Sequence, residues 1–432
     1  MSSYLITCTP AHGHVMPLLQ ITRHLIARGH EVGFLTSPRY AAEVSAAGAR
    51  FIALPTEADV DLDDANSAFP DRIGLTGPAA LRFDMSNLFV RPGAAQLGAV
   101  RAELAERSID AVLTEPLFVG GALLQLLPQR ERPPVVVLGI FPLGARSRDA
   151  APFGLGVTPM PGPIGRIRNA VLRTIAEQVV FGGIQREADD MARREVGREL
   201  GGFVLDWAGR ADAYVQFTVP EFEYPRSDLP STVHFAGPLP SPKSERTLPA
   251  WWSDPDGSRP VVHVTQGTIA NSDFGQIVMP TITALAASDV LVVVSTGGRP
   301  VEALPADLPA NVRVADYLPY DRLLPLVDVM VTNGGYGGVQ QALAHGVPIV
   351  VAGQTEDKVE VSARVGWTGA GVNLRASTVT PEQVGRAVGK VLKDPTYRAN
   401  AERIGSAMRE TDALSTLGDV LDASSRGWVA AG

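Results

Sequence analysis

The chain has 432 residues, of which 45% are apolar and 19% charged, so it carries enough hydrophobic material for full-sized cores and too little charge for a disordered chain. At this length two domains are expected. The net charge of −8 argues against nonspecific nucleic-acid binding. The single cysteine, Cys8, excludes an intramolecular disulfide and multi-cysteine metal sites and favours a reducing, cytoplasmic compartment.

The N-terminal residues lack the basic segment of a signal peptide. Apolar runs such as Ala287–Ser295 are shorter than the roughly 18 residues that a membrane span needs. We therefore expect a soluble protein without stable membrane insertion.

The first half alternates short apolar strands with helical segments. It opens with an expected strand at Tyr4–Cys8, a Gly/Pro/His loop at Thr9–Pro17, and a helix at Leu18–Arg28 that ends at Gly29. The further expected strands are His30–Thr36, Arg50–Ala53, Asp110–Thr114, Val135–Gly139, Ala213–Thr218 and Val233–Ala236. The further expected helices are Tyr40–Gly48, Ala94–Glu106 and Gly165–Gly201, the last interrupted at Gly182-Gly183. This alternation predicts an α/β fold with a parallel sheet.

A segment rich in Pro, Ser and charge, residues 239–260, is the expected interdomain linker between an N-terminal domain (1–238) and a C-terminal domain (261–432). The second half repeats the pattern. Its expected strands are Val261–Gln266, Leu291–Thr296, Val312–Ala315, Val329–Thr332 and Pro348–Ala352, and its expected helices are Phe274–Ala287, Pro381–Leu392, Arg398–Thr411 and Leu414–Val429. Two doubly wound halves place a ligand cleft between their strand C-terminal edges, and the last helix is expected to pack back on the N-terminal domain.

The strongest local feature is the segment Val329–Gly338 (VMVTNGGYGG). A buried strand ends in four glycines, at 334, 335, 337 and 338, and a helix follows at once. Glycines let the backbone approach a ligand, and a helix start presents free N–H groups, so the pattern suits a diphosphate as well as a simple tight turn. The loop Gln266-Gly267-Thr268, directly after the first strand of the second half, is a second candidate for the same diphosphate.

Two histidines, His12 and His14, follow the first strand of the chain. The positive end of a helix disfavours imidazolium, so a histidine there is expected to stay neutral and to accept a proton. Glu115 follows the strand Asp110–Thr114 on the same sheet edge, where a carboxylate orients a histidine and stabilises its protonated form.

Three other loops carry polar or aromatic residues. Gln354–Lys358, which includes Glu356 and Asp357, follows a strand and suits sugar hydroxyls as well as solvent, and Tyr317 offers a ring for stacking a base or for packing. The acidic run Asp59–Asp64 is interpreted as a solvated surface, not a metal site.

Four segments, in this order, resemble the family 1 glycosyltransferases, the UDP-glycosyltransferase superfamily of GT-B fold. They are HGHVMPLL, the QGT loop, the run from Asp316 to Val351, and QTEDK. The likeness covers essentially the whole chain and is closest to bacterial macrolide and antibiotic glycosyltransferases. It implies two Rossmann-like domains facing a central cleft. It also implies inverting transfer of a sugar from a UDP- or dTDP-sugar to a hydroxyl of a hydrophobic small molecule, without metal or other cofactor.

The resemblance assigns roles to particular positions. The base histidine stands three residues before the proline, at His14, and the orienting carboxylate, usually Asp, is Glu115. His12 and Phe141 are assigned to the acceptor side. The positions assigned to the donor are Gly267, Thr268, Tyr317, Leu318, Tyr320, Asn333, Gly334, Gly335, Gly337, Gly338, Gln341, Glu356, Asp357 and Lys358.

The chain departs from the family pattern at several of these donor positions. Asn333 stands where the family commonly has a phosphate-binding histidine, and Gly337 and Gly338 replace side chains of Asn and Ser. Backbone N–H groups are therefore left to hold the diphosphate. Further along, Gln341 replaces a ribose-binding Glu, Tyr320 replaces a Gln, and Asp357-Lys358 replaces the Asp-Gln pair that reads the sugar, so the base and sugar of the donor stay open.

Rival interpretations are a lipid or sterol glycosyltransferase, a nucleotide-sugar epimerase or hydrolase, and a catalytically silent homologue that binds a nucleotide sugar or supports a partner transferase. A dinucleotide oxidoreductase is disfavoured because neither half has the G-x-G-x-x-G spacing. The segment Pro163–Val180, apolar with three arginines, is interpreted as a surface helix, an acceptor wall or a membrane-surface element. The protein is expected to be a monomer or a homodimer.

Overall fold

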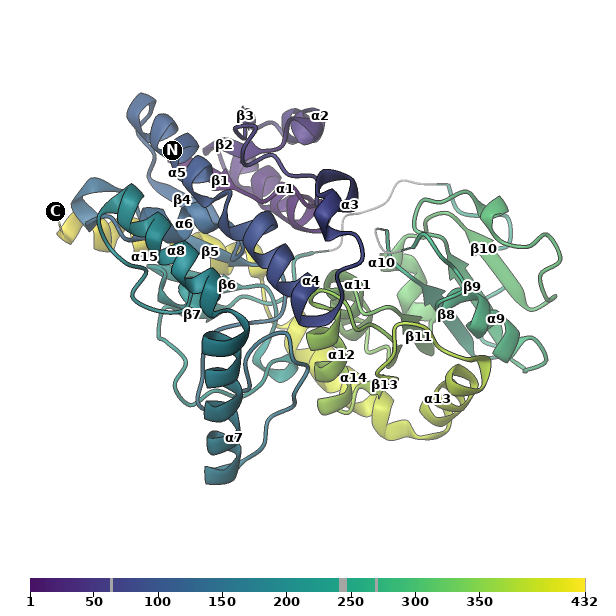
Figure 1. Cartoon of the computed structure of the whole chain (residues 1–432). Helices are drawn as coiled ribbons and strands as arrows, with labels where there is room; N and C mark the ends of the chain where they lie inside the picture. Colours follow the sequence, from purple (N-terminus) through teal and green to yellow (C-terminus); the bar gives the residue numbers. More distant parts are fainter. Residues whose placement is uncertain (63–64, 241–246, 269–270, 432) are drawn as a thin grey trace.

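The computed structural model describes residues 1–62, 65–240, 247–268 and 271–431, which form two α/β domains (Figure 1). Each domain is built on one sheet in which all paired strands are parallel. The predicted fold class, two doubly wound parallel-sheet domains, is therefore confirmed. Residues 241–246 of the expected linker lie outside the described residues.

The N-terminal sheet has seven strands in the order β3-β2-β1-β4-β5-β6-β7. These are β1 Ser3–Thr7, β2 Glu31–Thr36, β3 Arg50–Ala53, β4 Ala111–Thr114, β5 Val135–Gly139, β6 Ala213–Gln216 and β7 Val233–Phe235. Its helices are α1 His12–Ala27, α2 Ala41–Ala46, α3 Ala65–Ala68, α4 Gly77–Asp84, α5 Gly93–Glu106, α6 Val119–Gln125, α7 Gly162–Thr174 and α8 Gly182–Val196, with π-helical turns at Met85–Val90 and Ile175–Val180. The central strands β4 and β5 are buried along their whole length because both faces of the sheet are covered by helices.

The C-terminal sheet has six strands in the order β10-β9-β8-β11-β12-β13. They are β8 Val261–Thr265, β9 Leu291–Ser295, β10 Val312–Ala315, β11 Val329–Thr332, β12 Ile349–Val351 and β13 Gly371–Asn373. The helices that follow them are α9 Val278–Leu285, α10 Tyr320–Leu323, α11 Tyr336–Ala344, α12 Lys358–Trp367, α13 Pro381–Lys393, α14 Pro395–Arg409 and α15 Ala413–Ala431.

The predicted strands agree with the structure to within two residues, and β13 was not expected. The helices differ more: α9 begins at Val278, not at Phe274, and α8 ends at Val196, not at Gly201. Helices α3, α4, α6, α10 and α12 were not expected. Helix α1 begins at His12, so the expected loop is shorter and Pro17 lies inside the helix. The last helix, α15, contributes Ala413, Leu417, Val420 and Leu421 to the core of the N-terminal domain.

Both sheets have a topological switch point, where the chain reverses the direction in which it adds strands. In the N-terminal sheet this point lies between β1 and β4, and in the C-terminal sheet it lies between β8 and β11. Loops diverge there, and parallel α/β sheets bind ligands outside the carboxyl ends of the flanking strands. The fold therefore marks the residues after these four strands as the ones to examine.

The carboxyl edges of the two sheets meet. The Nε2 atom of Gln216, at the end of β6, donates a hydrogen bond of 3.2 Å to the hydroxyl of Tyr336, the first residue of α11. Gln340 of the same helix donates to the carbonyl oxygen of Phe217 at 2.9 Å. The start of α11 is thus held against the edge of the N-terminal sheet.

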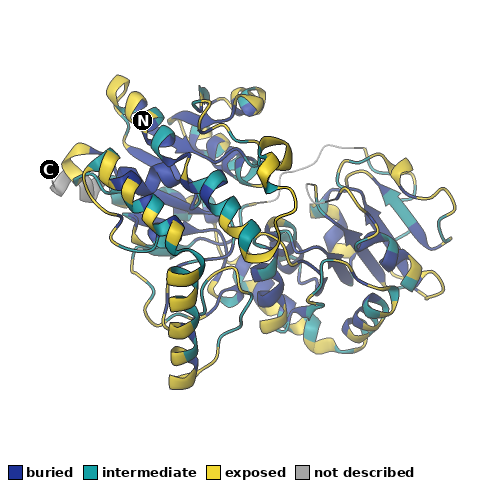
Figure 2. Cartoon of the chain, in the orientation of Figure 1, coloured by how far each residue is buried: buried dark blue, intermediate teal, exposed yellow. Residues whose placement is uncertain are grey.

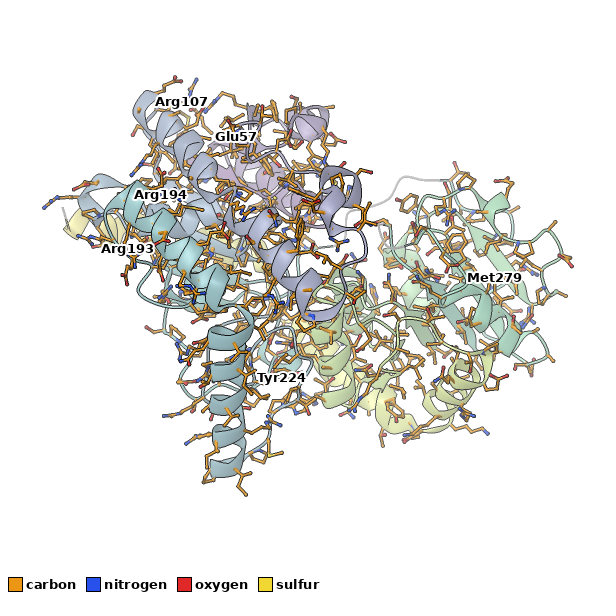
Figure 3. All side chains as sticks on the ribbon, viewed as in Figure 1. Glu57, Arg107, Arg193, Arg194, Tyr224 and Met279 are labelled. Carbon is orange, nitrogen blue, oxygen red and sulfur yellow. The ribbon has the colours of Figure 1, made fainter. Side chains whose placement is uncertain are left out.

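A buried ion-pair network, built around Arg364 of α12, adds to this junction. The guanidinium of Arg364 lies 2.8 Å from Glu223 of the N-terminal domain and 2.8 Å from Glu360 of its own helix, and it covers the ring of Tyr224 (labelled in Figure 3).

Figure 2 shows the mostly buried sheets of both domains and the exposed residues of α7. Among the described residues, no helix is long and apolar enough to cross a membrane.

Candidate active site

The first switch point brings Thr9, His14 and Glu115 together. Strands β1 and β4 pair in parallel with Thr7 opposite Thr114, so Thr9 and Glu115 leave the sheet at the same edge. Helix α1 starts three residues after Thr9, which makes His14 its third residue. The histidines predicted to lie on a loop are therefore in the first helical turn.

Glu115 is fully buried, and its carboxylate accepts three hydrogen bonds. The backbone N–H of Thr9 (3.2 Å) and the hydroxyl of Thr9 (2.6 Å) both donate to Oε1, and the backbone N–H of Leu117 donates to Oε2 at 2.7 Å. Buried carboxylates require such partners, so Glu115 is fixed as an anion at the end of β4.

The imidazole of His14 meets this carboxylate directly and through Thr9. Its Nδ1 atom lies 3.4 Å from Oε2 of Glu115 and 3.0 Å from the hydroxyl of Thr9. Because the Thr9 hydroxyl donates its proton to Glu115, it accepts from Nδ1–H of His14. That tautomer leaves the lone pair of neutral His14 on Nε2.

The pKa values of the pair shift in opposite directions. Burial lowers the pKa of His14, but the charge of Glu115, its hydrogen bond and the charges of Asp357 and Glu356 together outweigh burial and raise that pKa above 6.5. Burial likewise raises the pKa of Glu115, and the charge of His14 with the hydrogen bonds from His14, Thr9 and Leu117 lowers it below 4.5. The helix start was expected to keep His14 neutral; the carboxylate instead makes it a stronger base.

Of the two residues assigned to the acceptor side, Phe141 lies next to the imidazole of His14 and His12 lies on a different side of helix α1. The ring of Phe141, which follows β5, is 5.9 Å from the ring of His14, and Phe153 continues the aromatic row at 6.0 Å from Phe141. His12 is the first residue of α1, two positions and about 200° around the helix from His14. Within the described part of the chain it makes no hydrogen bond or ion pair.

At the second switch point, one glycine after β11 is required by the backbone conformation, and two others leave open space. Gly334 has a φ of +87°, and a Cβ there would lie 2.9 Å from Val351, so the backbone itself requires glycine. By contrast, a Cβ at Gly337 would have no neighbour within 4 Å, and one at Gly338 would meet only Met330 at 3.8 Å. These two glycines, in the first turn of α11, leave open space in front of the helix start.

Asn333 joins this loop to the loop after β8. Thr332 pairs with Thr265 across the two strands, so Asn333 and Gln266 follow side by side. The Asn333 amide donates to the carbonyl oxygen of Gln266 at 2.5 Å. Asn333 therefore positions the two glycine loops, Gly334-Gly335 and Gly267-Thr268, next to each other.

A third loop at this edge, Thr296–Arg299 after β9, was not singled out in the sequence. A Cβ at Gly297 would lie 1.9 Å from the carbonyl oxygen of Gly267, and one at Gly298 would lie 2.8 Å from the ring of Tyr317. Asn271 fastens the loops by donating to the carbonyl oxygens of Gly267 and Thr296, each at 3.0 Å. The two adjacent glycines of the sequence TGGR, at residues 296–299, are the sequence feature from which this loop could have been predicted.

The segment assigned to the nucleobase contains one exposed side chain and two that pack into the C-terminal domain. Tyr317 is exposed beside Gly298, whereas the side chain of Leu318 lies in the C-terminal core. Tyr320 points back under the sheet and donates its hydroxyl proton to Nε2 of His263 at 3.1 Å. His263 accepts because burial lowers its pKa to about 4 and its Nδ1–H is bonded to Val293.

The loop before α12 brings charge toward His14. Burial raises the pKa of Asp357, and the charges of Asp357 and Glu356 contribute to the raised pKa of His14. The ammonium group of Lys358 forms an ion pair with Glu356. Gln341 is half-buried in α11. The loop before α12 in the C-terminal domain therefore lies close enough to His14 of the N-terminal domain for its charges to affect the pKa of His14.

Within the described residues, no group of three or more His, Cys, Asp or Glu side chains is arranged to hold a metal ion. Asp63 and Asp64 of the acidic run lie outside the described residues, and Asp61 forms an ion pair with Arg39 at 2.6 Å.

Comparisons with known proteins agree with this geometry. Residues 279–413 match the family model of the erythromycin biosynthesis protein CIII-like C-terminal domain. The chain is 41% identical over 421 residues to 4'-demethylrebeccamycin synthase of Lentzea aerocolonigenes, covering 97% of this chain and 98% of that protein. It is 35% identical to UDP-glycosyltransferase 2 of Phaeomoniella chlamydospora, with 97% and 94% covered. Its fold matches the calicheamicin glycosyltransferase CalG4 with a TM-score of 0.74 at 20% identity over 98% of both chains.

The two parallel-sheet domains and these relatives together define a glycosyltransferase of GT-B fold. The chain belongs to the UDP-glycosyltransferase superfamily, family 1, and within it resembles the antibiotic glycosyltransferases.

Proposed function

We propose that the protein transfers a sugar from a UDP- or dTDP-sugar to a hydroxyl of a hydrophobic natural-product-like small molecule, with inversion at the anomeric carbon and without a metal ion. The observation that carries this proposal is the pairing of His14 with Glu115 at the switch point of one sheet, opposite the open glycine turn at the switch point of the other. The rebeccamycin relative supports the acceptor class.

The chemistry assigned to the N-terminal edge is proton transfer. The acceptor hydroxyl gives its proton to Nε2 of neutral His14 while its oxygen attacks the anomeric carbon, and the bond from that carbon to the diphosphate breaks. Glu115 stabilises the imidazolium that forms, directly and through Thr9. General-base assistance of this kind contributes about 10²–10⁴ to the rate.

The chemistry assigned to the C-terminal edge is charge stabilisation. The first N–H groups of α11 have no partner inside the helix, and Gly337 and Gly338 let phosphate oxygens approach them. The leaving diphosphate is therefore stabilised by the helix start and by Gly267 and Thr268, and Tyr317 offers its exposed ring to the base.

The acceptor side is assigned to the aromatic row of Phe141 and Phe153. The ring of Phe141 lies next to the imidazole of His14, and the ring of Phe153 lies next to that of Phe141. Two phenylalanine rings suit a flat or apolar acceptor, and they have no hydrogen-bonding groups with which to bind a free sugar or water.

The experiment is product analysis with UDP-, dTDP- and GDP-sugars, each with and without a panel of aromatic natural-product acceptors. The proposal predicts a glycoside of inverted configuration only when acceptor is present, and a thermal shift with UDP or dTDP but not GDP. Free sugar without acceptor would indicate a hydrolase. No product and no nucleotide-induced shift would indicate a silent homologue.

A further inference from the structure

Helix α7 with the π-helical turn after it, residues 162–180, carries an exposed row of aliphatic side chains. Five of them are solvent-exposed: Ile164 (75%), Ile167 (65%), Val171 (53%), Ile175 (47%) and Val179 (74%). We call these five residues the α7 row. Figure 1 shows α7 projecting from the body of the N-terminal domain, and Figure 2 shows its exposed side. Contiguous apolar surface of this extent usually marks an interaction site.

The amphipathicity of α7 is inverted, because the polar face of the helix is turned toward the protein. Arg166 forms an ion pair with Asp149 at 3.0 Å, and Asn169 donates to the carbonyl oxygen of Arg148 at 3.1 Å. Gly165 packs so tightly on Met160 that a Cβ there would lie 1.8 Å from its carbonyl oxygen. These contacts fix α7 to the loop before it and leave the apolar face outward.

The spacing of the α7 row is that of a helix-packing seam. The steps are three, four, four and four residues, and the turn Ile175–Val180 is π-helical, which adds one residue to its turn. Without that extra residue the last step would be three, so the steps would read three, four, four and three, with one seven-residue repeat on each side of Val171. All five members are β-branched, so their side chains have few rotamers to lose when they pack.

We propose that the α7 row is a dimerisation surface on which a second copy of this chain packs its own α7 antiparallel about a two-fold axis. The row is symmetric about its centre: Val171 faces Val171 of the other copy, Ile167 faces Ile175, and Ile164 faces Val179. Such self-complementarity is what a two-fold interface requires. The exposed area amounts to roughly 500 Å² per copy, or about 1,000 Å² for the pair, within the lower range of specific interfaces.

A membrane surface fits the same row less well. Helices that lie on bilayers carry Trp or Phe at the interface and Lys or Arg that are free to reach the lipid headgroups. Residues 162–180 contain no aromatic residue and no lysine, and Arg166 and Arg173 bond to the loop on the opposite side of the helix. This inference does not depend on the proposed sugar transfer.

The test is sedimentation velocity of the full chain over about 1 to 100 µM, because dimer formation depends on protein concentration. Wild type is expected to show a concentration-dependent dimer. Val171→Glu is expected to weaken association by tenfold or more, because it places two carboxylates opposite each other at the axis. Val301→Glu, at an exposed position of the C-terminal domain, is the matched control and should dimerise as wild type does.

Val171→Cys gives an independent readout that does not depend on how Val171→Glu folds. The chain has a single cysteine, Cys8, and it is buried, so the new thiol is the accessible one. Oxidation should yield a disulfide-linked dimer with Val171→Cys and not with Val301→Cys. A wild-type chain that stays monomeric throughout, a dimer insensitive to Val171→Glu and not cross-linked through Cys at 171, or a monomer that sediments with anionic vesicles through the α7 row would overturn the proposal.

Discussion

The hydroxyl of Thr9 donates a 2.6 Å hydrogen bond to Glu115, and the same oxygen lies 3.0 Å from Nδ1 of His14. Thr9 and Glu115 come from loops after adjacent strands, so the sheet itself sets their separation. The imidazole of His14 is therefore oriented by a carboxylate and a hydroxyl together, in a three-residue arrangement.

Replacing Thr9 by valine keeps the side-chain shape and removes the hydroxyl. It leaves a buried carboxylate oxygen short of one donor and His14 Nδ1 short of one acceptor, a loss of about 1–3 kcal/mol. We expect kcat to fall about 10- to 100-fold with donor affinity unchanged, and Thr9→Ser to restore most of it. Steady-state kinetics of both variants check this. A valine enzyme with wild-type kcat would show that the hydroxyl does not contribute.

The pH dependence of kcat/KM follows from the raised pKa of His14. Only neutral His14 accepts a proton, so the rate of the wild-type enzyme should decline as the pH falls through a pKa above 6.5. Glu115→Gln removes the largest of the charges that raise this pKa, and burial, which lowers the pKa, then weighs more. The acid limb should therefore move to lower pH while the plateau falls by about 10- to 100-fold. A limb that stays in place or moves to higher pH would contradict the assigned pair.

The glycine turn predicts a variant that affects binding and not folding. A leucine at Gly337 meets no protein atom within 4 Å of its Cβ, but it enters the space in front of the α11 start. We expect Gly337→Leu to lower UDP or dTDP affinity by about tenfold or more while the midpoint of thermal unfolding holds or rises, since leucine favours helix. Gly389→Leu, in α13 and equally open, is the matched control and should bind nucleotide normally. Calorimetric titration of both variants decides between them.

The buried ion pair between the domains predicts a large stability effect. Arg364→Ala leaves the buried carboxylates of Glu223 and Glu360 without their shared partner, which should lower the free energy of unfolding by about 3–5 kcal/mol. Arg193, an exposed residue labelled in Figure 3, pairs with Asp190 and Glu199 at the surface, and Arg193→Ala should change stability little. Chemical denaturation of the two variants measures the difference, and similar losses would be inconsistent with this role of Arg364.

Much of the fold could be predicted from the sequence because parallel strands buried on both faces are short, continuous apolar runs. Val135–Gly139 and Val329–Thr332 are of this kind, and their boundaries are confirmed. Helix α12 was missed because buried charged residues interrupt its apolar pattern: Lys358, Glu360 and Arg364 turn inward to form ion pairs.

The candidate site was predictable where it depends on chain position and not where it depends on contacts. The order of strands put Glu115 and His14 at one edge, and the structure shows that they meet. The role of Thr9, the bond from Asn333 to Gln266 and the direction of the His14 pKa arise from contacts between distant parts of the chain. No local pattern in the sequence carries that information.

The most direct test of the proposed reaction separates proton transfer from donor binding in one variant, His14→Ala. Removing the imidazole should lower kcat by about 10²–10⁴ while the affinity for UDP or dTDP, measured by calorimetry, changes by no more than about twofold. Turnover at the wild-type rate would contradict the assignment of His14 as the base.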